Sequence, residues 1–62
     1  MASAEKALFL AKAFYEAARL DLKYMPQAKP IYIAALSKNA YMQKSAQIRN
    51  YYLSVAQELE QQ

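Results

Sequence analysis

The chain has 62 residues and a net charge of +3, from eight Lys and Arg residues and five Asp and Glu residues. A chain of this length predicts one small domain over residues 1–62, because only about 60% of the unfolded surface is buried at this size. The sequence contains no Cys, His or Gly, which excludes disulfides, P-loops and Gly-rich dinucleotide loops. We also expect no metal site, since Cys and His supply nearly all structural zinc ligands, and no cofactor.

Residues 3–24 are predicted to form the first helix, because they contain no Gly or Pro and their apolar residues recur at helical spacing. These residues fall on two faces, one including Leu8 and Leu22 and the other Phe9 and Leu20. A helix that is apolar over more than half of its circumference has to be covered on more than one side. We therefore expect this helix to be the central one.

Two prolines predict a turn over residues 25–29. Pro26 is expected to end the first helix, and Pro30 fits the first turn of the next. Beyond Pro30 there is no further Gly or Pro, which favours one long helix over about 30–60. The prediction is then an all-α helical hairpin that self-associates into a bundle.

A three-helix bundle with a break near 39–45 is the alternative. This segment is polar, and Ser45 is suited to capping a third helix. The apolar residues before the segment, such as Leu36, point about 120° away from those after it, such as Ile48 and Val55, on one ideal helix.

The residues that commonly carry catalysis are missing. Without His and Cys, the chain lacks the commonest general base and the best thiol nucleophile. Its five carboxylates are scattered along the sequence, and none is spaced to pair with another for acid–base work. We therefore predict that the protein is not an enzyme.

Helix–helix protein interaction is the function that the sequence favours. The first helix has more apolar surface than two short helices easily cover, and tyrosine, present six times, is enriched at interfaces. We expect a structural, assembly or adaptor module whose partner is itself or another helical protein. The candidate contact residues are Phe9, Tyr24, Tyr32, Tyr41, Tyr51, Tyr52 and Leu53.

A small basic nucleic-acid-binding protein is the alternative function. Between Leu22 and Gln57 the chain has basic residues and no acidic ones, an arrangement that suits an anionic partner. Amide and tyrosine side chains between these basic residues could contact phosphates and stack on bases. The candidates are Lys29, Lys38, Lys44 and Arg49.

No run of residues has the length and apolar composition of a signal peptide or a transmembrane segment, which favours a soluble intracellular protein. Two segments resemble pieces of the microtubule-interacting-and-transport and tetratricopeptide families of helical hairpins. The first consists of Met25, Ala28, Tyr32, Ala35 and Leu36, and the second is Tyr52–Leu59. Their separation is too short for the first family by roughly two helical turns, and the Gly and Trp pattern of the second is missing. We assign no family from these segments.

Overall fold

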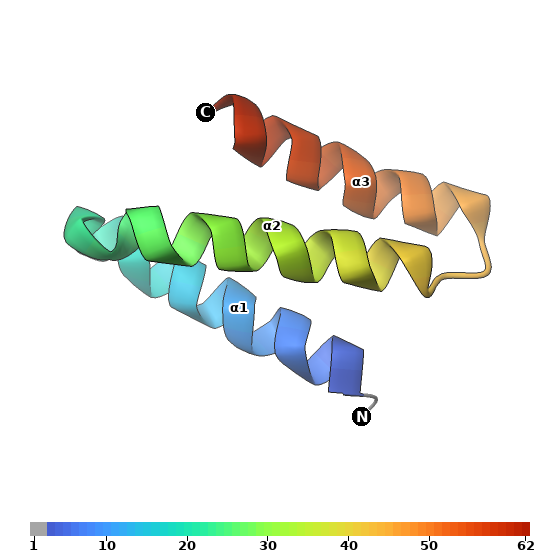
Figure 1. The fold of residues 1–62 in the computed structure, drawn as a ribbon, viewed down its shortest axis with the longest axis horizontal. Coiled ribbons are helices and arrows are strands. Elements are labelled where there is room, and N and C mark those ends of the chain that lie inside the picture. Colours follow the sequence, from blue (N-terminus) through green and yellow to red (C-terminus); the bar gives the residue numbers. More distant parts are fainter. Residues whose placement is uncertain (1–2) are drawn as a thin grey trace.

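The computed structural model describes residues 3–62, which form three α-helices and one short 3-10 helix (Figure 1). The elements are α1 (Ser3–Leu20), η1 (Leu22–Tyr24), α2 (Met25–Tyr41) and α3 (Ala46–Gln61). No strand occurs in the described part of the chain, so the predicted all-α fold is confirmed. The single long helix expected over about 30–60 is instead divided into α2 and α3, which is the three-helix alternative. The break between α2 and α3, at residues 42–45, lies within the interval expected for that form.

The central helix is α2, which corrects the expectation that the first helix would be central. In Figure 1, α1 and α3 lie on either side of α2 and run antiparallel to it. Across residues 3–62, no Cα atom of α1 lies within 8 Å of a Cα atom of α3. The adjacent residues Asn39 and Ala40 of α2 are both buried and point about 100° apart, as a helix covered on two sides requires.

The connection between α1 and α2 lies earlier than the predicted turn at 25–29. The first helix ends at Leu20, Asp21 is extended (φ −140°, ψ 93°), and residues 25–29 already belong to α2. Pro26 lies in the first turn of α2, where its missing N–H leaves no helical hydrogen bond unmade. It therefore begins the second helix rather than ending the first, and Pro30 lies inside α2.

Alanine supplies most of the buried core. Two leucines, Leu36 and Leu59, are the larger buried apolar residues. The remaining buried apolar residues are Ala4, Ala11, Ala18, Ala28, Ala40 and Ala56. Those of α1 recur every seven residues and so lie on one line along the helix. Small side chains allow the α1 backbone to approach α2 closely, but each contributes little apolar area to the core.

The buried side chain of Asn39 joins the C-terminal half of α2 to the start of α1. Its Nδ2 donates a hydrogen bond to the Ala4 carbonyl oxygen at 2.7 Å, and the residue is only 2% exposed. Gln43 supports it, since its Nε2 lies 3.5 Å from the Asn39 side-chain Oδ1, to which it donates, and 3.3 Å from the Asn39 backbone carbonyl oxygen. A buried amide needs such partners, because an unpaired polar group is costly away from water.

The first turn of α3 is capped as the sequence predicts. The Ser45 hydroxyl oxygen accepts a hydrogen bond from the Ile48 backbone N–H at 3.4 Å. In the same connection, the Arg49 guanidinium donates to the Gln43 carbonyl oxygen at 3.2 Å. These two contacts stabilise the connection at residues 42–45, where the chain reverses direction without Gly or Pro.

Asn39→Ala should lower the free energy of unfolding by about 1–3 kcal/mol, because it removes a buried hydrogen bond and leaves a cavity. Urea denaturation followed by circular dichroism measures this change. The control is Asn50→Ala, at an exposed position of α3, which should change stability by less than about 0.5 kcal/mol. Equal effects of the two substitutions would contradict the role given to Asn39.

Ser45→Ala should cost about 1 kcal/mol by removing the N-cap of α3. Ser54→Ala is the matched control, since Ser54 is exposed in the middle of the same helix, where alanine is the better helix former. The same denaturation experiment should therefore show opposite signs for the two substitutions. A Ser45→Ala protein as stable as the wild type would show that the cap contributes nothing.

Candidate protein-interaction surfaces

The outward face of α1 carries large apolar side chains that no other part of the structure covers. Phe9 is 65% exposed, Leu10 56% and Leu20 91%, and Ala13 and Ala17 are exposed between them. At 100° per residue these five positions fall within an arc of about 100°, opposite the buried alanine line. We call them the α1 strip.

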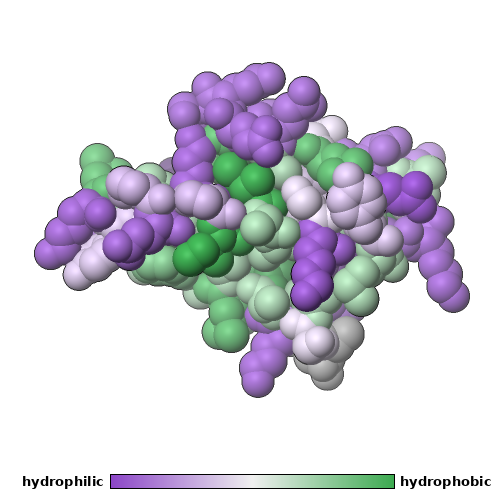
Figure 2. Space-filling model, in the orientation of Figure 1, coloured by the Kyte–Doolittle hydropathy of each residue, from purple (hydrophilic) through white to green (hydrophobic). Residues whose placement is uncertain are grey.

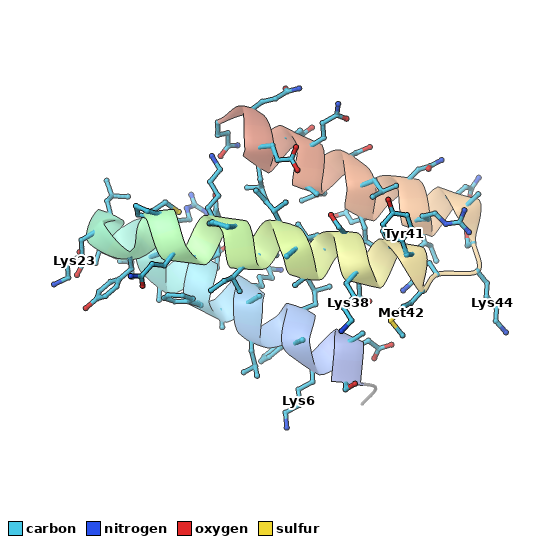
Figure 3. All side chains as sticks on the ribbon, viewed as in Figure 1. Lys6, Lys23, Lys38, Tyr41, Met42 and Lys44 are labelled. Carbon is cyan, nitrogen blue, oxygen red and sulfur yellow. The ribbon has the colours of Figure 1, made fainter. Side chains whose placement is uncertain are left out.

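Charged residues border the α1 strip along one side, and one lies within its arc. On the bordering side, the Glu16 carboxylate lies 3.4 Å from the Arg19 guanidinium in an exposed ion pair, and Lys12 lies one turn before Glu16. Lys6 lies within the arc, one turn before Leu10, and extends from α1 away from α2 (Figure 3). Exposed pairs of this kind add little to stability, so these charges are free to contribute to recognition instead.

A second candidate surface is a cavity of about 250 Å³ between α1 and α3, over α2. Its lining is mostly aromatic and aliphatic, with one basic residue: Leu8, Lys12, Tyr32, Leu36, Tyr51, Tyr52 and Val55. The ring of Tyr15 packs against that of Tyr32 with centroids 5.0 Å apart. We call this the tyrosine groove. It exists because α1 and α3 each pack on α2 while their backbones stay apart.

Tyr32 has the only resolved pKa shift among the described residues. Partial burial raises the pKa of its hydroxyl above the ordinary value of 10.0. The nearby Glu16, Tyr51 and Tyr15 raise the pKa further, because each is or becomes negatively charged. The hydroxyl therefore stays neutral at physiological pH and can serve as a hydrogen-bond donor in the groove.

The seven predicted contact residues divide into an exposed and a partly buried set. Phe9, Tyr24, Tyr41 and Tyr51 are exposed by 65%, 44%, 75% and 65%. Tyr32, Tyr52 and Leu53 are partly buried. Tyr32 and Tyr52 pack against the core formed by Leu36, Ala56 and Leu59. The structure thus does not bring the seven together on one surface: Phe9 lies in the α1 strip, whereas Tyr32, Tyr51 and Tyr52 line the groove.

The four predicted nucleic-acid contacts also separate. Lys29 donates a hydrogen bond from Nζ to the Gln62 carbonyl oxygen at 2.6 Å, and Arg49 is hydrogen-bonded to Gln43 as described above. Lys38 and Lys44 are exposed. In Figure 3, Lys38 leaves α2 toward α1, whereas Lys44 extends from the connection beyond the end of α2. Two of the four basic side chains are therefore already hydrogen-bonded to backbone carbonyl oxygens of their own chain.

Several exposed apolar residues did not figure among the sequence-based candidates. They are Leu10, Leu20, Leu22, Ile31, Met42 and Ile48. Figure 2 shows apolar side chains reaching the surface over α1 and α2, whereas hydrophilic side chains cover the outer part of α3. Leu10 and Leu20 lie on the second apolar face predicted for the first helix, which could have identified them as contact residues. Only Phe9 of that face was included among the candidates.

Comparison with known proteins gives no family and no similar chain: no family model, no curated protein and no solved structure matches. Among the described helices, none is both long enough and apolar enough to span a lipid bilayer. The α1 strip and the tyrosine groove are therefore the features that bear on function.

Tyr32 should make the protein less stable at alkaline pH. Since its pKa is higher in the folded than in the unfolded chain, the folded state binds more protons above about pH 10. The stabilisation is complete below the unfolded-state pKa and is lost as pH rises through the folded-state pKa. Between about pH 9 and pH 11, the free energy of unfolding of the wild type should fall relative to that of Tyr32→Phe.

Denaturation in urea at both pH values, for both proteins, measures this difference. Tyr41→Phe is the matched control, because Tyr41 is 75% exposed and lies outside the groove. If Tyr32→Phe and the wild type lost stability in parallel, Tyr32 would not be the group responsible.

Proposed function

We propose that the chain is a non-enzymatic assembly module that associates with a second copy of itself through the α1 strip. The observation that carries the proposal is the distribution of apolar residues between inside and outside. Ten large apolar residues are exposed in the described part of the chain, whereas the buried core holds two leucines and otherwise alanine. Burial of the exposed side chains on association would stabilise the fold as well as the assembly.

Surface area supports the same proposal. A folded monomer of 7.1 kDa exposes about 4,100 Å² on average, whereas this chain exposes 4640 Å². A standard interface buries about 800 Å² on each partner. Covering a patch of similar size would bring the exposed surface down to the range of compact proteins.

The α1 strip is a better interface than the tyrosine groove for self-association. It lies on one straight helix, and it contains the most exposed of the large apolar residues, Leu20. Two alanines, Ala13 and Ala17, lie between the large residues near its two ends, which lets a facing helix approach closely in the middle. The groove residues Tyr32 and Tyr52, by contrast, already pack against the core of their own chain.

The alternative function, nucleic-acid binding, has less support. It needs several basic groups directed at phosphates. Lys29 and Arg49 instead hydrogen-bond to backbone carbonyl groups of their own chain.

The wild-type chain should therefore have the mass of at least two chains by light scattering, with little change between about 0.05 and 0.5 M salt. Phe9→Gln/Leu20→Gln should weaken association by about 100-fold or more, because burying one such side chain is worth about 1.5–3 kcal/mol. Glutamine preserves helix propensity, so circular dichroism should show that α1 remains.

Tyr41→Gln is the control for loss of an exposed aromatic residue outside the α1 strip. It should leave the mass unchanged. A wild-type mass of one chain at high protein concentration would overturn the proposed function, and equal effects of Tyr41→Gln and the double variant would exclude the α1 strip as its basis.

A further inference from the structure

Building on the proposed self-association, we infer that two copies pair α1 against α1 in antiparallel orientation, with Phe9 of each chain opposite the partner's Leu20. The interface is isologous, since a two-fold axis makes each contact occur twice. It lies at the outer edge of each molecule, on the side of α1 that faces away from α2.

The register follows from the positions of the two largest side chains in the α1 strip. Phe9 and Leu20 lie near its two ends and point about 160° and 180° away from the buried Ala11. Antiparallel pairing places the end of one strip against the start of the other. Phe9 then meets the partner's Leu20 in two reciprocal contacts, whereas Leu10 lies opposite the partner's Arg19. Ala13 near the middle allows the two helices to approach closely.

Charge complementarity selects this arrangement independently. In the register that sets Phe9 opposite Leu20, Lys12 lies opposite the partner's residue 17. The partner's Glu16 is one residue away from that position, which is about 1.5 Å along the helix axis. Lys12 and Glu16 border the same side of the strip, so they meet across a two-fold axis perpendicular to the helices. Two reciprocal Lys12–Glu16 pairs form, and Glu16 keeps its contact with Arg19.

Parallel pairing of the same faces does not bring these charges together. Its two-fold axis runs along the helices, so Lys12 and Glu16 lie on the opposite side of the interface from the partner's Lys12 and Glu16, and no reciprocal Lys12–Glu16 pair forms. Parallel pairing would also align the two helix dipoles in one direction. The antiparallel pair is therefore the arrangement in which apolar contacts and charges agree.

Disulfide cross-linking tests the orientation directly, because the chain has no native cysteine. We would mix Phe9→Cys with Leu20→Cys under oxidising conditions. In the mixed dimer only one of the two Phe9–Leu20 contacts is replaced, so the other still holds the pair together. The expected result is a disulfide-linked heterodimer in the mixture and little linked dimer from either variant alone.

Each variant alone should not cross-link, because identical positions lie eleven residues out of register, about 16 Å apart along the axis. Cysteines whose Cα atoms are more than about 7 Å apart cannot form a disulfide without movement of the backbone. A mixture containing Tyr41→Cys measures random collision. Linked dimers of Phe9→Cys alone would show parallel pairing and overturn the inference. A dimeric wild-type mass without linkage in the mixture would overturn this register and leave self-association standing, whereas a monomeric wild type would overturn both.

Charge exchange tests the flanking pairs with the apolar residues unchanged. Glu16→Lys should raise the dissociation constant about 3- to 10-fold, since two attractive contacts become repulsive. Lys12→Glu/Glu16→Lys restores opposite charges across the interface and should return the constant to within about twofold of the wild type. Sedimentation equilibrium at low salt measures all three proteins. Failure of the double variant to recover would overturn the proposed register.

Discussion

Close packing of α1 on α2 through alanine is the constraint on which the rest of the structure depends. Ala4, Ala11 and Ala18 present only methyl groups to α2, so the two backbones approach closely along this line, and Leu8 and Tyr15 pack beside it. Phe9 and Leu20 lie on the opposite side of α1. The small core and the apolar outer surface thus have one cause, the placement of alanine on one side of α1 and of larger apolar residues on the other, and the proposed self-association would cover the outer surface.

Asn39 gives this alanine contact its orientation. Methyl groups pack equally well in several registers, whereas the hydrogen bond from Asn39 to the Ala4 carbonyl oxygen forms in one. The bond ties the start of α1 to the last turns of α2 and so sets how far the two helices overlap. The open groove lined by Tyr32 and Tyr51 then follows from the position of α3, which packs on another side of α2.

The all-α class was predictable, because a chain without glycine and rich in alanine has few alternatives to helix. The Ser45 cap was also readable from local chemistry. The central position of α2 was not, since the periodicity of α1 counts alanine and phenylalanine alike as apolar although only the alanine side is buried. The end of α1 at Leu20 was missed because no local signal marks it, and Pro26 is compatible with both the end of one helix and the start of another.

For the interaction surfaces, sequence periodicity identified the second apolar face of α1, but it did not show that this face lies in solvent. Phe9 was recognised as a contact residue, whereas Leu20, which is more exposed, was expected to be covered by another helix. The tyrosines were predicted as one group because the residue type alone does not show whether a side chain is buried or exposed in the fold. Burial separates Tyr32 and Tyr52, which pack on the core, from Tyr41, which does not.

The separation of the α1 and α3 backbones, in the part of the chain that the structure describes, has a kinetic consequence. Each helix pair is a local hairpin of neighbouring segments, so folding requires no closure of a long loop and should be fast, as in other helical domains of low contact order. The two hairpins share α2 in the manner of nearest neighbours in a repeat array. Either outer helix can consequently detach while the other hairpin persists, and amide hydrogens of α3 should exchange with solvent through openings that leave the α1–α2 pair protected.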